Sequence, residues 1–401
     1  MFTNKGELTY CSNIHAGESW EDHFRALDKY FPSIKKEVSP DQSMGLGLRL
    51  SHIASVELVK KENLQSFTEW LEKNNAYVFT MNGFPYGGFH RTVVKENVHS
   101  PDWRTKERVD YTLRLFDILS TLLPAHLDGG ISTSPLSYRH WFTDAAEATA
   151  AKQTATENIL LIAEQLISIH RTTGKLLHLD IEPEPDGMLE TGPEFISWFQ
   201  DHLMAIGIPA IATRCGVSES TAADLLTTHI RLCYDVCHFA IGYEPHATII
   251  KQLDKLGIKI GKIQISAALK AAMASKDEDR KSIRKAFEAF DEPTYLHQVV
   301  ARIDDKNLLR YRDLPQALKD VQNSSVKEWR AHFHVPVFEK DFGLLQSTQD
   351  DILEVLKIHK KNALTQHLEV ETYTWEVLAE KSKLPLHESI VRELQWVKEQ
   401  L

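Results

Sequence analysis

Long hydrophobic runs are absent from this sequence of 401 residues. No segment approaches about 18 uninterrupted apolar residues, and the first residues, MFTNKGELTY, carry neither the basic stretch nor the apolar core of a secretion signal. These absences exclude a membrane-spanning protein and argue against export by a standard signal, so we expect a cytoplasmic protein. No period of roughly 20–50 residues recurs, which excludes a solenoid.

Cysteine is scarce, and the sequence has no concentration of positive charge. The four cysteines, Cys11, Cys215, Cys233 and Cys237, show no paired CxxC spacing, so we expect reduced thiols rather than a disulfide framework. The formal net charge is −10, and the densest charged run, residues 276–285, mixes both signs. Because nucleic-acid binders need a basic patch to neutralise phosphates, we expect no nucleic-acid partner.

What the sequence does contain is an alternation of short strand-like runs with helix-length amphipathic segments. This alternation predicts a parallel sheet with crossover helices. Nine runs predict strands: residues 8–15, 46–52, 76–83, 130–136, 176–182, 230–236, 260–266, 330–338 and 365–371.

The polar residues of these strands fall on one face. The run LHLDIE, residues 177–182, places three apolar side chains on one face and His, Asp and Glu on the other, and HLEVE, residues 367–371, shows the same split. Strands of an open parallel sheet are buried on both faces and should be apolar throughout. A closed barrel instead packs the apolar set under its helices and directs the polar set inward. The pattern predicts a (β/α)₈ TIM barrel.

We expect residues 1–401 to form a single barrel domain, because α/β barrels with insertions reach this length. A barrel closes with eight strands, so residues 365–371 are predicted as the eighth strand, and 330–338 as an extended arm in the connection before it.

Three further segments lie outside the barrel core. Residues 267–329 are predicted to fold as helices over the barrel mouth, and residues 84–104, which are rich in Gly, Pro, Tyr and His, as a loop that covers it. A terminal helix is expected over residues 386–401.

Candidate functional residues lie at the carboxyl ends of four successive strands, where TIM barrels place their active sites. They are Glu182, Asp235, Gln264 and Glu371. Three carboxylates and an amide suit Mg²⁺ or Mn²⁺, whereas added imidazoles would favour Zn²⁺ or Co²⁺. The sequence therefore predicts one divalent metal ion of undetermined identity.

Two alternatives to a metal site stay open. Lys262 and Arg231 could neutralise two of these acids, which would leave a metal-free polar pocket or a purely structural network. His238, three residues after Asp235, is either a second metal ligand or a hydrogen-bonded pocket residue.

At these positions the sequence resembles the xylose isomerase-like barrel superfamily, which includes ketose epimerases, inosose-processing enzymes and endonuclease IV. More specifically, it resembles the metabolite traffic protein EboE family, whose reaction is not established. The resemblance spans nearly the whole chain and is carried by the runs TYCSNIHAGESW, NGFPYGGFH, HLDIEPEPDG, EPTYLHQVV, HFHVPVF and HLEVETYTW.

The superfamily resemblance implies metal ligands at Glu182, Asp235 and Glu371, and at a strand-seven residue that is commonly His but is Gln264 here. His334, in the run HFHVPVF, is expected to supply the missing imidazole. The resemblance also implies isomerase or epimerase chemistry, in which Glu182 and Glu371 remove and return a proton next to a carbonyl while the metal stabilises the enediolate.

Several residues are predicted to contact the substrate, each with a structural alternative. His15 and Asn82 would complete the rim of the mouth, or else cap a helix and form a turn, respectively. Glu184 could replace Glu182 as a ligand. Tyr295, His297 and Arg302 are placed on a helix over the mouth that could equally be a solvated helix, and Trp375 forms either a wall beside a sugar ring or part of the core.

Three functional hypotheses follow. The first is a metal-dependent isomerase, epimerase or related lyase for a small polyol-like metabolite. The second is a binding or carrier protein that keeps the pocket without catalysis, motivated by Gln264 and by the gene clusters for metabolite movement that give EboE its name. The third is a zinc-rich phosphodiesterase like endonuclease IV. The sequence leaves open whether the chain forms a homo-oligomer.

Overall fold

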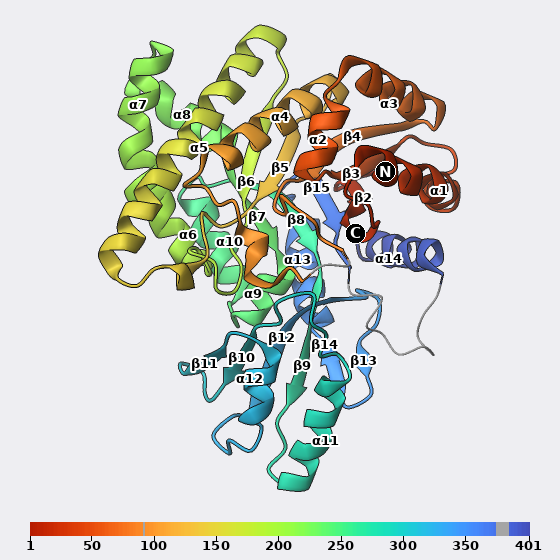
Figure 1. Cartoon of the computed structure of the whole chain (residues 1–401), viewed down its shortest axis with the longest axis vertical. Helices are drawn as coiled ribbons and strands as arrows, with labels where there is room; N and C mark the ends of the chain where they lie inside the picture. The colour runs from red at the N-terminus through yellow and green to blue at the C-terminus, as the bar shows by residue number, and fades with distance from the viewer. Residues whose placement is uncertain (91–92, 374–384) are drawn as a thin grey trace.

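A computed structural model describes residues 1–90, 93–373 and 385–401 (Figure 1). Eight parallel strands form one sheet, in which β15 lies between β8 and β2, and a short strand β1 (Phe2–Thr3) pairs antiparallel with β2. The parallel strands are β2 (Gly6–Tyr10), β3 (Met44–Arg49), β4 (Ala76–Asn82), β5 (Gly129–Thr133), β6 (Leu177–Ile181), β7 (Ile230–Asp235), β8 (Ile260–Ile265) and β15 (His367–Val370).

The sheet closes between its first and last members. The Thr9 hydroxyl on β2 donates to the Gly45 carbonyl on β3 at 2.8 Å, and the Gly47 N–H donates to the same hydroxyl at 3.1 Å. Cys11 and Gly47 also form a parallel bridge. The predicted (β/α)₈ barrel, with residues 365–371 as its eighth strand, is therefore confirmed.

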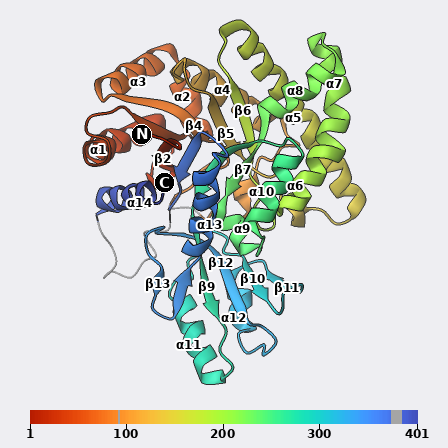
Figure 2. The same cartoon turned by 180° about the vertical axis from the view of Figure 1, so that it is seen from behind.

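Helices surround the strands, as both views show (Figures 1 and 2). They are α1 (Trp20–Val38), α2 (His52–Leu58), α3 (Lys61–Lys73), α4 (Lys106–Leu122), α5 (Ala145–Thr173), α6 (Gly192–Trp198), α7 (Ala205–Cys215), α8 (Glu219–His229), α9 (Val236–Ile241), α10 (His246–Lys255), α13 (Gln349–Lys361) and α14 (Leu386–Gln400). Short 3₁₀ segments cover Ser12–Ile14, Lys95–His99 and Arg139–Trp141, and a π-helical segment covers Phe199–Met204.

The barrel interior is polar, as the alternation predicts. Lys262 on β8 is fully buried and donates to Glu369 on β15 at 2.7 Å. Two glycines make room for such charges: a Cβ atom on Gly47 would lie 1.9 Å from the Glu369 carboxylate, and one on Gly261 would lie 1.9 Å from that of Asp180. The carboxylates of Glu369 and Asp180 thus pack directly against the backbone of these glycines.

A second, antiparallel sheet is inserted between β8 and α13. It has the order β11-β10-β12-β9-β14-β13, and it lies at one end of the molecule (Figure 1). Its elements are β9 (Ala267–Ala272), α11 (Asp277–Glu288), β10 (Val299–Arg302), β11 (Leu308–Tyr311), α12 (Leu314–Lys319), β12 (Glu328–Val335), β13 (Asp341–Phe342) and β14 (Leu345–Ser347). Only Ser266 separates β8 from β9, so one nearly continuous strand joins the barrel to this sheet.

The prediction that residues 267–329 fold as helices is wrong, because this segment also contains strands. The two helices α11 and α12 lie among strands, and the predicted helix that carries Tyr295 and Arg302 is instead a loop followed by β10. The β-branched pair Val299 and Val300 pairs with β11 on one side and β12 on the other. This two-sided pairing overrides a helical spacing of only two turns.

The remaining predicted segments pack against these layers. The C-terminal helix corresponds to α14, which lies beside α1 (Figures 1 and 2). The loop over residues 84–104 reaches the inserted sheet, since the Val94 N–H donates to the Thr294 carbonyl at 2.7 Å. None of the helices in the described part of the chain is long and apolar enough to cross a membrane.

Candidate metal centre at the barrel mouth

Three carboxylates converge at the carboxyl ends of the barrel strands. Glu182 follows β6, Asp235 ends β7 and Glu371 follows β15. One oxygen of each lies within 4.8 Å of the others, and all three side chains are buried. No Lys or Arg in the described ranges forms an ion pair with any of them, although burying unpaired negative charge is costly. The group therefore has the composition of a site for a divalent cation.

Glu371 is held by amide groups. Its Oε1 accepts hydrogen bonds from Asn13 at 2.7 Å and from Asn82 at 2.8 Å, and its Oε2 accepts one from Gln264. These side chains come from three different barrel segments. Their amide donors fix the orientation of the carboxylate in the mouth.

Asp235 is held by the start of the helix that follows it. Its Oδ1 accepts from the backbone N–H of His238 at 3.2 Å, as an N-cap of α9 does, and from the Ser266 hydroxyl at 2.6 Å. The second oxygen, Oδ2, lies 4.0 Å from His238 Nε2. Asp235 thus lies between the other carboxylates and a neighbouring group of imidazoles.

Glu182 is the least constrained of the three. Its backbone N–H donates to Thr133, and its Oε1 lies 3.8 Å from His238 Nδ1. Its Oε2 is buried and accepts no hydrogen bond from the residues the structure describes. An orphaned, buried carboxylate oxygen that faces two other acids fits a cation ligand.

Burial and neighbouring negative charge raise the pKa values of Glu182 and Glu371. Burial, followed by the charges of Glu371 and Asp235, raises the pKa of Glu182 well above its ordinary value. Burial and the charges of Asp235 and Glu369 do the same for the pKa of Glu371. The charge of Lys262, which pairs with Glu369 deeper in the barrel, offsets only part of this shift.

Gln264 joins the carboxylates through its amide nitrogen. Its Nε2 donates to Glu371 and lies 3.4 Å from Asp235 Oδ2, while its Oε1 accepts from the Cys233 thiol at 2.7 Å. A ligand role for its carbonyl, predicted from the superfamily pattern, would therefore require the amide to rotate.

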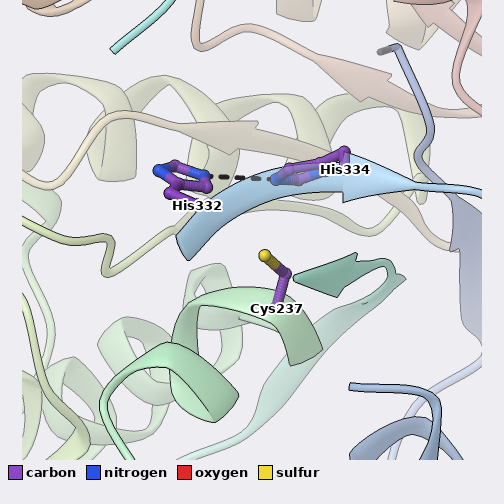
Figure 3. Close-up of side chains that lie close together, drawn as sticks. All are labelled: Cys237, His332 and His334. Atoms are coloured by element: carbon purple, nitrogen blue, oxygen red, sulfur yellow. Dashed lines mark hydrogen bonds between the residues drawn. The ribbon is translucent and has the colours of Figure 1, made fainter. Parts of the chain in front are cut away.

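Three imidazoles form a second group beside the carboxylates. Nε2 of His332 lies 3.2 Å from Nε2 of His238 and 3.3 Å from Nε2 of His334. His332 and His334 lie near the carboxyl end of strand β12, where Figure 3 shows their rings side by side, and His238 comes from α9. Burial lowers the pKa of His334 to about 4. We call these three residues the imidazole group.

Cys237 lies close to this group without facing it. Its Sγ is close enough to His332 and His334 to share an ion, but its thiol donates to the Phe333 carbonyl at 3.3 Å. In Figure 3 the thiol reaches β12 from α9 on the side of the ribbon opposite the two rings.

A small cavity joins the carboxylates and the imidazoles. It holds about 50 Å³. The polar lining includes Glu182, Glu184, Glu371 and all three imidazoles, and Phe84, Phe89 and Tyr373 form an apolar wall.

Known structures share the architecture but little sequence. A xylose isomerase-like TIM barrel protein from Mycobacterium smegmatis in complex with magnesium is 7% identical, with 100% of this chain and 98% of that chain covered at a TM-score of 0.52. The chain has the xylose isomerase-like TIM-barrel fold. A putative sugar phosphate isomerase/epimerase from Anabaena variabilis is 11% identical (98% of each chain, TM-score 0.47). An IOLI protein with bound zinc is 12% identical (98% and 96%, TM-score 0.47). No protein-family model and no curated protein sequence matches the chain.

The mouth of this xylose isomerase-like barrel brings most of the predicted metal ligands together. Glu182, Asp235, Gln264 and Glu371 lie in one cluster, and His238 and His334 lie beside it. Glu184, predicted as an alternative to Glu182, instead pairs with His99 at 2.8 Å, although one of its oxygens also lies within 4.8 Å of His238 and His332.

The predicted substrate contacts separate into two sets. Asn82 lines the cavity and bonds Glu371, and it also accepts from the Phe84 N–H in the turn that follows. Tyr295 donates to the Phe89 carbonyl at 3.0 Å, which joins the inserted sheet to the loop of residues 84–104.

Asn82 and Glu184 line the cavity, whereas Tyr295, His15, His297 and Arg302 are absent from its described lining. His15 bonds the Tyr10 hydroxyl at 3.1 Å, and His297 bonds the His332 carbonyl at 2.8 Å. Arg302 pairs with Glu328, at the end of β12 that is distant from the imidazoles. Trp375 lies outside the described residues.

Sequence reasoning left out four residues of this centre: Asn13, His99, Gln298 and His332. A signal existed for His332 alone, because the alternation in HFH places it on the same face as His334. Asn13 and His99 lie in short 3₁₀ segments and Gln298 in a loop, and no periodicity in the sequence specifies the paths of these segments.

Proposed function

We propose that this chain is a divalent-metal-dependent isomerase or epimerase that removes a proton next to the carbonyl of a small polyhydroxylated metabolite. The observation that carries the proposal is the cluster of three buried carboxylates, Glu182, Asp235 and Glu371, which has no Lys or Arg side chain paired to it in the described ranges. Such a cluster suits charge that a bound cation supplies.

The three carboxylates would hold one divalent ion. Their oxygens favour Mg²⁺ or Mn²⁺, and the nearby His238 and His334 would favour Zn²⁺ or Co²⁺. When bound, the ion would polarise the carbonyl of the substrate and stabilise negative charge on its oxygen.

The surroundings of the two glutamates support different roles. Glu182 has an oxygen without a hydrogen-bond donor in the described structure, so it is suited to accept the proton from the substrate carbon. Glu371 is fixed by Asn13, Asn82 and Gln264, so it is suited to return a proton at a defined position. Strands β7 and β8 separate the strands that carry them, so the two carboxylates approach the cavity from different sides.

The cavity lining supports a sugar-like substrate. Asn13 and Asn82 offer amide groups to hydroxyls, and the wall formed by Phe84, Phe89 and Tyr373 offers apolar surface to the C–H face of a ring.

Solvent exchange tests the proposal. The Mn²⁺-loaded protein is incubated in D₂O with a panel of neutral ketoses and inososes, and deuterium at carbon is followed by NMR. Glu182→Gln should lower the exchange rate by about 100-fold or more, because a positioned base contributes on that order.

Glu244→Gln is the matched control, since Glu244 is a partly buried carboxyl whose pKa burial raises to about 8, but it accepts a hydrogen bond from the Gly192 N–H away from the mouth. The control should exchange like the wild type. Two outcomes would contradict the proposed catalysis. One is deuterium exchange that persists in Glu182→Gln, and the other is the absence of exchange into every compound of the panel with the wild type.

One observation favours the alternative of a non-catalytic metabolite-binding protein. The Gln264 amide donates to Glu371 and approaches Asp235, and so provides part of the positive potential that an ion would supply. This role agrees with the resemblance to the EboE family. A ketose that raises the melting temperature without any exchange of deuterium into it would support binding alone.

A further inference from the structure

A buried carboxyl group on the C-terminal helix has no part in the proposed chemistry. Glu393 on α14 is buried, and apart from Ser389 the other buried residues of this helix are apolar. In the described part of the chain it bonds neutral groups rather than a Lys or Arg side chain. Burying a carboxyl group is costly, so its place on this helix needs a specific reason.

One oxygen of Glu393 joins two segments at the barrel mouth. Its Oε1 accepts a hydrogen bond from the Thr372 hydroxyl at 2.6 Å and one from the Val337 N–H at 3.1 Å. Burial raises the pKa of Glu393 to about 7, and these two bonds oppose the rise. Thr372 directly follows Glu371, and Val337 lies three residues after His334. The C-terminal helix thus contacts the chain next to a carboxylate and an imidazole of the mouth.

Both segments lie beyond the ends of their strands. Strand β15 ends at Val370, and the next N–H, that of Glu371, donates to Ile265 on β8 at 3.1 Å. One residue further, the Thr372 hydroxyl ties the chain to α14. The two segments also contact each other, since His334 Nδ1 bonds the Glu371 carbonyl at 3.2 Å. A displacement of Thr372 would therefore move the backbone that carries the Glu371 carboxylate.

We propose that Glu393 and Thr372 are positioning residues for the metal site, because they hold the backbone that carries Glu371. They keep its carboxylate directed at the other two carboxylates of the cluster. Outer partners of this kind orient the ligands of a metal, and their loss typically costs about 10–100-fold in metal affinity. This role rests on the metal site of the proposed function and extends the support of that site to the C-terminal helix.

Titration with Mn²⁺ alone tests the role without any activity assay. The full chain is treated with chelator, and free Mn²⁺ is then followed by electron paramagnetic resonance. Thr372→Val keeps the shape of the side chain but removes the hydroxyl, and it should raise the Kd for Mn²⁺ by about 10-fold or more. Thr372→Ser keeps the hydroxyl and should bind Mn²⁺ with the wild-type Kd.

Variants of Glu393 give the same contrast. Glu393→Gln keeps an oxygen that can accept both bonds, so its Kd should stay within about threefold of the wild type. Glu393→Leu should weaken Mn²⁺ binding at least as much as Thr372→Val. The double variant Thr372→Val/Glu393→Leu should bind no more weakly than Glu393→Leu, because the bond between the two side chains is already lost.

Thr156→Val is the matched control. The Thr156 hydroxyl is buried and accepts from Trp198 Nε1 at 3.0 Å between α5 and α6, outside the lining of the mouth cavity. This variant should lower the melting temperature and leave the Kd for Mn²⁺ unchanged, which is the response expected of a purely structural hydroxyl.

The two Thr372 variants decide the matter even if Glu393→Leu does not fold. A Thr372→Val protein that binds Mn²⁺ like the wild type, or a Thr372→Ser protein that binds as weakly as Thr372→Val, would overturn the positioning role. A raised Kd in Thr372→Val, with no deuterium exchange by the wild type, would support the positioning role and overturn only the isomerase. Wild-type protein that binds no Mn²⁺ would overturn both.

Discussion

The lower barrel and the barrel mouth both bury acids, but they neutralise them differently. In the lower barrel, Glu369 pairs with Lys262 at 2.7 Å, and Asp180 pairs with His178 at 2.6 Å. At the mouth, Glu182, Asp235 and Glu371 face one another with no Lys or Arg paired to them in the described part of the chain.

The same contrast extends to the lower edge of the barrel. Asp128 accepts from Arg231 at 3.1 Å and from His367 at 3.0 Å, and its Oδ2 lies 3.6 Å from His178. Burial alone would raise the pKa of Asp128, but the bonds from His178 and His367 outweigh it and hold that pKa below its ordinary range. The pKa values of Glu182 and Glu371 at the mouth are shifted in the opposite direction, above their ordinary value.

This difference separates structure from function within one barrel. The acids of the lower barrel are paired with basic side chains of the chain itself and need no ligand to offset their charge, so they stabilise the fold. Acids that repel one another at a strand-end cavity carry a cost that their amide and hydroxyl partners offset only in part, which is the usual sign of a functional site.

The largest effect is expected in the lower barrel. Lys262→Met would leave Glu369 buried without a partner and should lower the free energy of unfolding by about 3–5 kcal/mol, measured in urea. Lys262→Met/Glu369→Leu removes both charges and should recover most of this loss. A single variant as stable as the wild type would show that the lower acids are not held by pairing.

Removing a charge at the mouth should have the opposite effect on the free energy of unfolding. In chelator, Glu182→Gln removes one of three repelling charges and should raise the free energy of unfolding by about 1–2 kcal/mol. Added Zn²⁺ should reverse the order of stability, because the wild type binds the ion better. Destabilisation in chelator would mean that Glu182 has a stabilising partner.

The pH dependence of stability should also differ in sign between the two regions. A raised pKa, as in Glu182, means that stability is full below the ordinary value of 4.5 and is lost as the pH rises through the folded-state pKa. The advantage of Glu182→Gln in chelator should therefore shrink toward zero between about pH 8 and pH 4.5, as followed by urea unfolding.

Asp128→Asn tests the opposite pH dependence, because the pKa of Asp128 is lowered. A lowered pKa contributes stability above the ordinary value of 3.8, which is lost only as the pH falls through the folded-state pKa. The variant should be less stable than the wild type at neutral pH, with a constant difference down to about pH 4. A difference that varies between pH 8 and pH 5 would contradict this assignment.

The smallest effect is expected for Arg231→Gln. Its partner Asp128 is 20% exposed and keeps the bond from His367, so the loss should be about 1 kcal/mol in urea unfolding. A loss as large as that of Lys262→Met would mean that exposure does not separate these two pairs.

Much of the barrel could be predicted because period-two alternation is a local property. The runs LHLDIE and HLEVE each place charge on one face, and the structure turns those faces inward. The same alternation identifies the strand-end carboxylates, since the ends of parallel strands lie at one edge of the barrel.

The inserted sheet and the orientation of the side chains could not be predicted in this way. Strand β10 is too short to show a period, and it depends on partners as far as 10 and 32 residues away, as the pairs Val300–Arg310 and Val299–Ala331 show. The direction of the Gln264 amide depends on Cys233 and Glu371, which become its neighbours only after folding.

The imidazole group also has a topological consequence. His238 belongs to the barrel and His332 to the inserted sheet, 94 residues later in the chain, and all four cysteines are free thiols. This contact between the rings closes a long loop without a covalent bond. A disulfide across that span is worth roughly 4–5 kcal/mol in the chain-entropy model but would be lost in a reducing environment, whereas packing between the rings persists there.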